Sequence, residues 1–574
     1  MKAPLCLMIL CMISLLQAGQ LRIDMVHNHE DQSLRLHSLR YKQQEVYSVT
    51  RLSYLLSNFS IQRDTGEWVE LKNQYAYIDE GKRRTRFFLK DVPEGSYKSI
   101  RFALGVAKAT NHADPAQYSA DHPLNPNLNQ LHWNWSGGYI FLALEGRYRA
   151  EDQSLQGFVY HLANDNNFST IQLPGQFVLK QNTGLILGMD IAKLLGQPRA
   201  LSFIKDGSST HSHAGDPIAS SLIANLQSSF SLLSVTYPKD EMPTQAVTPL
   251  YLPEKYTPYR FAMSKRFPRP ALPRDNPLLE ERVALGKKLF HDTRLSRTNA
   301  ISCASCHHQE RAFTDGVPLS LGVEQRKGKR NSMPLFNLAW KSSFFWDGRA
   351  DSLRMQALMP IQDHLEMDES LENIVAKLGQ DASYQEAFQQ AFSGEEITSE
   401  KISLALECFL LTLTSYDSKF DRAMAGKEQL TEQEQRGMKL FFTEYEPRSG
   451  QYGADCFHCH GGANFSDHQF HNNGLKPTAD LGRYAITQLD RDKNSFSTPS
   501  LRNIALTAPY MHDGRFSTLE EVIDHYSGPM HRSENLDPNL AKHPGEGLQL
   551  SDEDKAALVA FLKTLSDPKY TTPR

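Results

Sequence analysis

The sequence predicts a two-part protein: a β-rich, β-sandwich-like N-terminal domain followed by a mainly α-helical half built from two similar lobes. Three observations lead to this prediction. Residues 20–235 contain alternating or aromatic runs separated by Asn, Asp and Gly, which is typical of strands and turns. A proline-dense stretch follows, and beyond it apolar side chains recur at helical spacing. At 574 residues the chain is also too long for one hydrophobic core.

The N-terminus carries an export signal. The first residues, MKAPLCLMILCMISLLQAG, combine a lysine, a short apolar run and small residues at Ala18 and Gly19. This pattern predicts a signal peptide over residues 1–19. Because the run is short for a membrane span and no comparable run follows, we expect an exported, periplasmic protein without a membrane span. The net charge of −4 gives no indication of nucleic-acid binding.

Residues 20–235 are predicted to form the β-rich domain. The runs SIRFALGV, GGYIFLALEG, GFVYHLA and GQFVLKQ are the clearest strands, and PIASSLIANLQSSFSLL is a helix-like tail. Residues 236–275 are rich in proline, which neither a helix nor a central strand tolerates. We therefore expect an extended linker, with a rise of about 3.1 Å per residue.

Four of the five cysteines outside the signal form two identical patterns, CASCH (Cys303, Cys306) and CFHCH (Cys456, Cys459). C-x-x-C-H is the attachment signature of c-type haem. A redox pair or half of a zinc site would explain one copy. Two copies, each with an adjoining histidine, in an exported chain predict two covalent haems. Cys408 lies in an apolar run and is expected to be a buried thiol.

The adjoining histidines, His307 and His460, are placed to supply an axial nitrogen to each iron. Helical patterns such as NPLLEERVALGKKLF, ISLALECFLLTLTSYDSKFDRAM, TEQEQRGMKLFF and SDEDKAALVAFLKTL surround the two motifs. We expect two cytochrome-c-like lobes, over residues 276–430 and 431–574.

Residues 276–570 resemble the bacterial dihaem cytochrome c peroxidase family, and within it the MauG-like branch. The stretches that carry the resemblance are LGKKLFHDTRLSRTNAISCASCH, AFTDG, RNSMPLFNLAW, FFWDGRADSLRMQA, CFHCHGGANFSD and TPSLRNIALTAPYMHDGRFSTLEEVIDHY. The resemblance implies two electronically coupled haems, of which the first reacts with hydrogen peroxide.

Two positions indicate the MauG-like branch. Val323 stands where the family's ordinary peroxidases have a loop histidine that blocks the first haem, so we expect this haem to be five-coordinate and open. Tyr526 stands where they have a methionine ligand for the second haem. A phenolate favours the higher oxidation states of iron. The alternative is that Tyr526 caps a helix end while Met530 or Met511 binds the iron.

The resemblance also implies a distal pocket. Glu366 would be the acid/base for peroxide cleavage, Gln356 would orient peroxide and Pro360 would shape the pocket. Trp346 would relay electrons between the haems. The family binds a calcium ion between its lobes, and its ligands map here to Asn331, Thr507 and Pro509.

Residues 20–235 resemble a second family, the MbnP-like copper proteins associated with methanobactin operons. The stretches YLLSNF, VPEGSYKSIRFALGV, NHADP, HPLNP, WNWSGGYIF and FVYHLA carry the resemblance. In that family a tryptophan of the W-x-W stretch is oxidised to kynurenine by a partner dihaem protein and helps to form a copper site. Trp133 and Trp135 would then be substrates. Core packing of two indoles on one face of a strand is the alternative.

Histidines are the expected copper ligands, since imidazole suits copper. We expect His27, His112 and His161, because their segments match the family. Five other histidines are second-choice candidates for copper ligands: His29, His122, His132, His211 and His213.

These expectations combine into one function. The protein is predicted to be an exported dihaem oxidase that uses hydrogen peroxide to oxidise Trp133 or Trp135, in its own MbnP-like domain or in that of another copy. The first alternative is a cytochrome c peroxidase that takes electrons from a small electron-transfer protein, a cytochrome c or a cupredoxin. The second is a copper-acquisition module in which the haem half acts once, during maturation.

Overall fold

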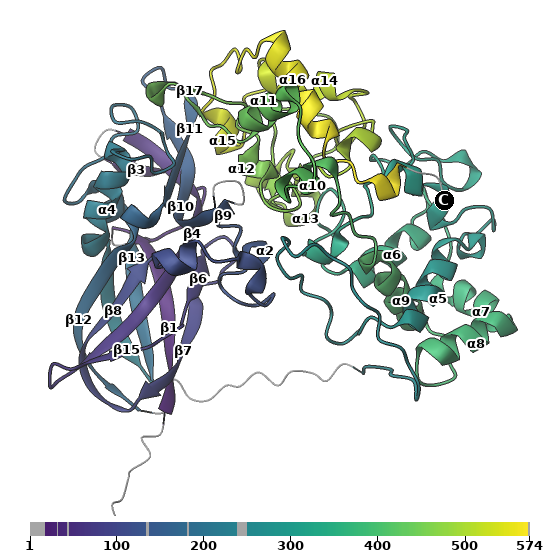
Figure 1. Ribbon diagram of the computed structural model, residues 1–574, viewed down its shortest axis with the longest axis horizontal. Helices are drawn as coiled ribbons and strands as arrows, with labels where there is room; N and C mark the ends of the chain where they lie inside the picture. The colour runs from purple at the N-terminus through teal and green to yellow at the C-terminus, as the bar shows by residue number, and fades with distance from the viewer. Residues whose placement is uncertain are drawn as a thin grey trace, which may run out of the picture. The chain divides into compact units, whose positions relative to one another are not determined.

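The structure is a computed structural model that describes residues 18–30, 32–42, 45–133, 137–180, 183–237 and 249–571 (Figure 1). Residues 1–17 of the predicted signal peptide and Trp135 lie outside the described residues. Two compact units divide the chain. The first contains residues 1–112, 139–144 and 160–244, and the second contains residues 113–138, 145–159 and 245–574. Within the described ranges, no helix is long and apolar enough to cross a membrane.

Two sheets make the N-terminal half strand-rich, which confirms the predicted fold class. In the smaller sheet β1 is central: β13 runs parallel to it on one side and β7 antiparallel on the other. Apolar side chains of β1 such as Leu21 and Ile23 are fully buried. The strands of this sheet are β1 (Ala18–His29), β2 (Gln32–Ser33), β7 (Arg86–Pro93), β13 (Gly184–Asp190) and β15 (Phe230–Thr236).

The larger sheet is organised on β4 (Glu45–Arg63), a strand rich in β-branched and aromatic residues. Its main path runs β12-β8-β4-β10-β11-β14, with β3, β5 and β6 paired to β4 and β9 paired to β10. The other strands are β3 (Arg40–Lys42), β5 (Trp68–Glu70), β6 (Ala76–Asp79), β8 (Gly95–Leu104), β9 (His132–Trp133), β10 (Gly138–Arg149), β11 (Leu155–Ala163), β12 (Ser169–Leu179) and β14 (Ser209–Thr210).

One predicted element differs from the structure. The helix-like tail is split into α4 (Pro217–Ser229) and the strand β15. Asp216 caps the helix by accepting hydrogen bonds from the backbone N–H groups of Ile218 and Ala219. The chain after Ser229 instead pairs with β13. Pairing along the sheet edge outweighs the local helical pattern there.

The predicted linker is only partly a spacer. Residues 238–248 lie outside the described part, but residues 250–275 pack on the first lobe. Phe267 is buried in the core of that lobe, and the Trp340 indole donates a hydrogen bond to the Pro268 carbonyl at 2.7 Å. Arg282 donates to the Leu250 carbonyl at 2.7 Å.

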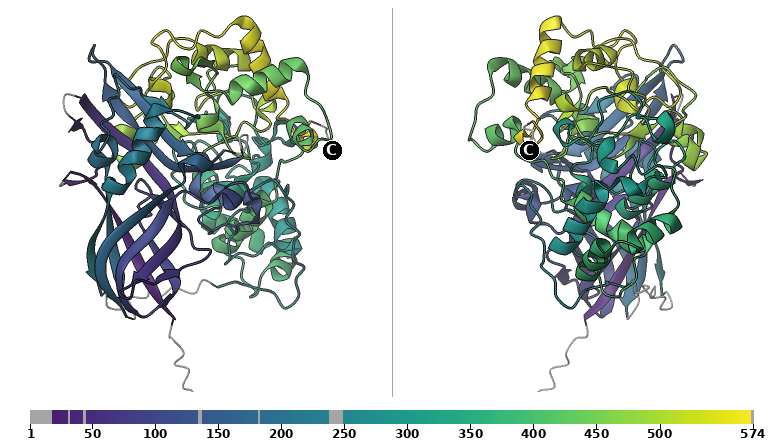
Figure 2. Two further views of the ribbon diagram at one scale, coloured as in Figure 1. Left: turned by 60° about the vertical axis from the view of Figure 1, so that its left-hand side comes forward. Right: turned by 90° about the vertical axis from the view of Figure 1, so that its right-hand side faces the viewer.

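The C-terminal half is helical, as predicted (Figures 1 and 2). Its long apolar pattern over residues 402–424 forms two helices, not one, because residues 413–418 break it. The helices of the first lobe are α5 (Glu280–Phe290), α6 (Leu353–Gln362), α7 (Leu371–Gly379), α8 (Ala382–Ala391), α9 (Ser399–Leu411) and α10 (Lys419–Met424). Those of the second are α11 (Glu432–Phe441), α12 (Phe457–His460), α13 (Tyr484–Thr487), α14 (Leu519–Ser527), α15 (Pro538–Ala541) and α16 (Asp552–Lys563).

The two lobes repeat the same helix packing. In the first, α5 packs on α9, and in the second, α11 packs on α16. Each pair crosses at a glycine. A Cβ at Gly286 would clash with the Ala405 carbonyl, and a Cβ at Gly437 would clash with the Ala557 carbonyl. The equivalent glycines place the C-terminal ends of α5 and α11 before their haem motifs in the same way.

Candidate functional site

The first C-x-x-C-H motif is arranged to hold a haem. Cys303 and Cys306 are free thiols at a short 3-10 helix whose N-cap is Ser302. The Nδ1 atom of His307 donates to the Phe313 carbonyl at 2.6 Å, and Phe313 has a left-handed backbone (φ 63°). This bond leaves Nε2 as the metal-binding nitrogen. Burial lowers the pKa of His307, which favours the neutral imidazole that an iron ligand requires.

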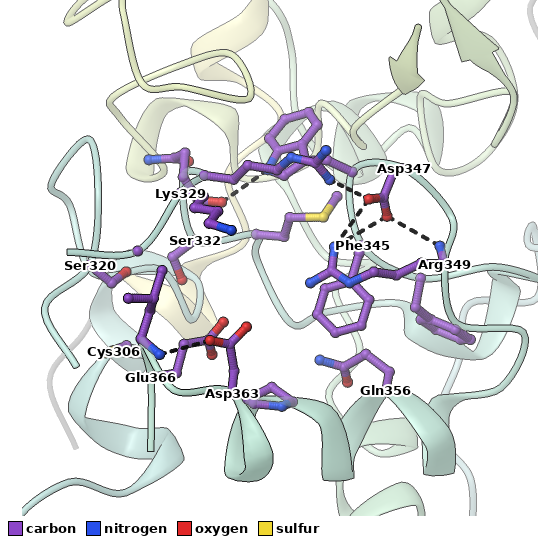
Figure 3. Close-up of a pocket in the computed structure, with 18 of the residues that line it drawn as sticks. Cys306, Ser320, Lys329, Ser332, Phe345, Asp347, Arg349, Gln356, Asp363 and Glu366 are labelled. Atoms are coloured by element: carbon purple, nitrogen blue, oxygen red, sulfur yellow. Dashed lines mark hydrogen bonds and ion pairs between the residues drawn. The ribbon is translucent and has the colours of Figure 1, made fainter. Parts of the chain in front are cut away.

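A cavity of about 980 Å³ opens in front of this histidine (Figure 3). Its lining includes Cys303, Cys306 and His307 together with the predicted distal residues Glu366 and Gln356. Much of the remaining lining is apolar, from residues of the first-lobe core. The site therefore has the attachment thiols, an axial nitrogen and an apolar space on one cavity, which fits a c-type haem.

Glu366 has the properties of an acid/base at neutral pH. Burial is the main cause that raises its pKa from 4.5 to about 7, and the Asp363 carboxylate adds to the rise, whereas Arg349 opposes it. Figure 3 shows Glu366 beside Asp363 on the wall of the cavity. A carboxyl group with this pKa is present in both protonation states near pH 7, so it can accept and return a proton.

Backbone packing fixes the position of Glu366. The N–H of Val323 donates to the Glu366 carbonyl at 2.8 Å, and the Val323 side chain is buried. A Cβ at the neighbouring Gly322 would clash with the carbonyl oxygens of Leu365 and Glu366. The loop that would carry a blocking histidine in ordinary family peroxidases therefore supports Glu366 here.

Gln356 and Pro360 reach the cavity from α6. They are four residues apart, so they share one face of the helix. In Figure 3, Gln356 extends from this helix into the cavity. Pro360 has no group that can bind iron.

Basic side chains contribute to the lining of the cavity. Arg330 pairs with Asp347 at 2.6 Å and with Asp480 at 2.6 Å, and Arg349 lies over the Phe345 ring with its guanidinium carbon 3.5 Å from the ring centroid. Lys341 also lines the cavity, and burial lowers its pKa to about 8. These cations can hold the anionic propionates of a haem.

Trp346 is buried where the two lobes meet. Its indole N–H donates to the Asn331 carbonyl at 2.9 Å, and its own carbonyl accepts from the Ser497 N–H at 2.7 Å. The Asn331 N–H in turn donates to the His512 carbonyl at 2.7 Å. Trp346 thus contacts the chain of both lobes, which is the place an electron relay requires.

The predicted calcium ligands are only partly accounted for. Asn331 donates its side-chain amide to the Val317 carbonyl at 3.0 Å, and Thr507 donates its hydroxyl to the Ile504 carbonyl. Pro509 follows a cis peptide bond. The calcium site stays a prediction.

The second motif repeats the first. The Nδ1 atom of His460 donates to the carbonyl of Phe465 at 3.1 Å, and Phe465 is again left-handed (φ 51°). Tyr526 lies close to this motif, since the Cys459 and Cys456 thiols add to the burial that raises its pKa. Its hydroxyl oxygen accepts a hydrogen bond from the Asn473 amide at 3.1 Å.

A comparison of the lobes relates Tyr526 to Pro360. Helix α6 is capped by Ser352 and α14 by Thr518. Counted from its cap, Tyr526 has the same place in α14 as Pro360 has in α6. The same helical position therefore presents a phenol in the second lobe and no ligand in the first.

Sequence reasoning missed a buried cluster near the second motif. His471 binds Asp537 through Nδ1 at 2.6 Å and Asp467 through Nε2 at 2.7 Å, and the Asp467 N–H donates to the Cys459 carbonyl at 2.8 Å. The matching Phe-Thr-Asp and Phe-Ser-Asp stretches after the two motifs were the signal that could have found Asp467. Nothing local in the sequence indicates Asp537.

The three predicted copper histidines are not gathered together. His27 is buried, with Nδ1 bound to Glu80 at 2.6 Å and Nε2 bound to the Tyr54 hydroxyl at 2.9 Å. His112 is half-exposed and pairs with Asp165 at 3.0 Å. The His27 ring would have to give up one of these bonds to bind a metal, whereas the bond of His112 engages only its Nε2.

In the structure His161 lies next to His211, one of the second-choice histidines. The rings of His161 and His211 meet edge to face with centroids 4.9 Å apart, and both side chains are buried. Trp133 is buried at the end of β9, and its carbonyl accepts from the Gly137 N–H at 2.8 Å.

Comparisons with known families cover most of the chain. Residues 18–212 match the MbnP family, residues 280–429 match the di-haem cytochrome c peroxidase family, and residues 420–566 match the cytochrome c family. The first match coincides with the strand-rich half, and the other two divide the helical half near the predicted boundary between the lobes.

Individual relatives resemble the helical half. A methylamine utilization protein MauG from Methylorubrum extorquens is 39% identical over 53% of this chain and 84% of its own. A cytochrome c551 peroxidase from Pseudomonas aeruginosa is 34% identical over 51% of this chain and 81% of its own. Among solved structures, a MauG-like protein associated with microbial copper homeostasis is 37% identical, covers 54% of this chain and 98% of its own, and superposes with a TM-score of 0.48.

Proposed function

The chain belongs to the MauG-like branch of the dihaem cytochrome c peroxidase family and carries an N-terminal MbnP domain, and we propose that this peroxide-dependent oxidoreductase oxidises a tryptophan of that domain to kynurenine. The observation that carries the proposal is the difference between Pro360 and Tyr526. Pro360 has no atom that could bind iron, so a haem held by His307 would stay open to peroxide. Tyr526 offers the second haem an anionic oxygen, which favours keeping oxidising equivalents over accepting electrons from a carrier.

The residues of the first pocket have defined tasks in this proposal. The two c-type haems, bound at Cys303/Cys306 and Cys456/Cys459, would supply the redox chemistry, with peroxide as the oxidant. Ionised Glu366 takes a proton from the peroxide oxygen that approaches the cavity and returns it to the oxygen that leaves as water. Gln356, on the same wall, orients peroxide by hydrogen bonding. Trp346 connects the two lobes for electron transfer.

The overall chemistry balances with peroxide alone. Two molecules of hydrogen peroxide oxidise one indole ring to N-formylkynurenine and leave as two waters, and hydrolysis then releases formate. Trp133 belongs to the second compact unit, which also holds both haem motifs, and this grouping supports oxidation within one chain. Oxidation of another copy is the second possible route.

The product would complete a copper site. An intact indole nitrogen is a poor ligand because its lone pair belongs to the ring, whereas kynurenine offers an aniline nitrogen and a ketone oxygen. We propose His161 and His211 as copper ligands, because their buried rings already lie edge to face. His27 is a weaker candidate because both of its ring nitrogens are engaged in hydrogen bonds, and His112 is a weaker one because it is half-exposed.

Peptide mapping of the purified protein, before and after addition of peroxide, tests the proposal. The peptide that contains Trp133 and Trp135 should change mass by the gain of one oxygen and the loss of one carbon. Trp133→Phe and Trp135→Phe, made separately, should show that one of the two abolishes this change. Trp68→Phe is the matched control, because Trp68 lies on a strand of the same half. If the peptide stays unmodified while peroxide is consumed, the two tryptophans are core residues.

A cytochrome c peroxidase is the second candidate, favoured by the relation to the cytochrome c551 peroxidase. Steady turnover of peroxide with a reduced small electron-transfer protein, at a rate that exceeds tryptophan oxidation, would support it. We expect slow turnover of this kind, because Val323 and Tyr526 replace the residues on which that cycle depends. We also expect the protein in the periplasm, and cell fractionation tests that expectation.

A further inference from the structure

Asn473 lies between Tyr526 and Met511, two of the three side chains that the sequence offers as ligands of the second haem. Its amide nitrogen Nδ2 donates to the Tyr526 hydroxyl oxygen at 3.1 Å, and the same nitrogen is 3.7 Å from the Met511 sulfur. An amide NH₂ has two N–H groups, so it can serve both acceptors at once. No motif of either family in the sequence drew attention to this residue.

The loop that carries Asn473 is fixed on both sides. Before it, His471 is held between Asp467 and Asp537 at 2.7 and 2.6 Å. The neighbouring Asn472 donates its amide to Ser533 and Asn535, each at 2.9 Å. The amide of Asn473 is therefore presented by a rigid backbone, and it does not have to be ordered when a ligand binds iron.

Helix α14 also positions Asn473. The His525 ring nitrogen Nε2 donates to the Asn473 carbonyl at 3.0 Å. His525 is adjacent to Tyr526 in the helix. The bond therefore fixes the distance between the donor amide and the helix that presents the phenol.

The two acceptors gain very different amounts from this donor. A hydrogen bond to an ionised oxygen is roughly twice as strong as one between neutral groups. A thioether sulfur is a weak acceptor. An amide in this position therefore stabilises a phenolate strongly. It also donates a weak hydrogen bond to the sulfur of Met511, one of the two methionines that could bind iron instead.

We propose that Asn473 is a positioning residue that selects Tyr526 over Met511 as the ligand of the second haem. The inference rests on the proposed function, in which Tyr526 is that ligand. Which side chain binds the second haem would then depend on Asn473 as well as on Tyr526. Without the amide, the phenolate loses its donor and the methionine sulfur becomes free.

The test replaces the amide and measures the ligand directly. Asn473→Leu removes the donor, and Asn473→Asp removes it without changing the shape of the side chain. In both we expect the absorption band of sulfur-to-iron charge transfer to appear in the ferric protein. The reduction potential of the second haem should rise by at least about 59 mV, a tenfold change in the one-electron equilibrium. A methionine ligand raises the potential of a haem. The additional change Met511→Leu should abolish the new band.

Two further variants separate the possible failures. Asn535→Ala removes one bond that holds the loop but keeps the Asn473 amide, so any shift of its spectrum and potential should be smaller than in Asn473→Leu and in the same direction. Tyr526→Phe should alter the spectrum of the second haem. If Tyr526→Phe alters the spectrum while both Asn473 variants keep the original spectrum and potential, the role of Asn473 is overturned. Tyr526 then remains the assigned ligand. If Tyr526→Phe changes nothing, the ligand assignment is overturned, and this inference with it.

Discussion

Glu366→Gln should raise the free energy of unfolding of the protein and also slow its reaction with peroxide. Raising the pKa of Glu366 from 4.5 to about 7 means that its ionised form costs about 3 kcal/mol in the folded state, at 1.36 kcal/mol per pH unit. Because the folded pKa is the higher one, stability is lost as the pH rises from 4.5 to about 7, and the loss is complete above that. Glutamine carries no charge and avoids this cost.

The expected stability difference therefore depends on pH. The variant should equal the original protein below pH 4.5 and exceed it by about 3 kcal/mol at pH 8. Urea denaturation followed by circular dichroism, at a series of pH values, measures it. A stabilised variant that loses activity is the signature of a group retained for function.

The rate of the reaction with peroxide should fall in the same variant. As a general base, Glu366 must be ionised, so the reaction of the haem with peroxide should slow by about tenfold per pH unit below about 7. Glu366→Gln should slow it by about 10²–10⁴-fold and remove the pH dependence. Stopped-flow absorbance measures both. If the variant reacts at the original rate, or the original rate is flat between pH 5 and 8, the proton-transfer role of Glu366 is refuted.

Three further outcomes are expected. Val323→His should place a possible ligand at the first haem, so its ferric spectrum should become low-spin and its reaction with peroxide should slow until the protein is reduced; an unchanged spectrum would show that this loop does not reach the iron. His161→Ala should abolish tight copper binding after peroxide treatment, measured by isothermal titration, whereas His112→Ala should retain it; the reverse result would place the site at His112. Gly437→Ala should destabilise the second lobe by about 1–3 kcal/mol in urea, since its Cβ would clash with the Ala557 carbonyl, and an unaffected midpoint would mean that α11 and α16 can separate at no cost.

Local patterns were sufficient for the broad architecture. The alternation in SIRFALGV predicted β8, and the helical spacing in TEQEQRGMKLFF predicted α11. These succeeded because a strand or helix that buries one face repeats apolar residues at its own period. The prediction failed for the tail after α4, because the strand there depends on pairing with β13, which lies far away in the sequence.

The haem motifs could also be recognised from the sequence. Two cysteines and a histidine must lie within one turn of chain to attach a porphyrin and bind its iron, so the chemistry fixes the spacing. Both C-x-x-C-H motifs take the same geometry, with the histidine Nδ1 bound to a left-handed phenylalanine. The comparison of α6 with α14, counted from the helix caps in the structure, then places Pro360 and Tyr526 at the same helical position.

The sequence by itself determined the two families, the two haem-attachment motifs and the residues that indicate the MauG-like branch, Val323 and Tyr526. Only the tertiary structure decided which groups act together: the burial that brings the pKa of Glu366 to about 7, the meeting of His161 with His211, and the amide of Asn473 between Tyr526 and Met511. The reason is physical. A covalent attachment or a helical face involves neighbours along the chain, whereas desolvation and hydrogen bonding depend on residues that the fold brings together from distant segments.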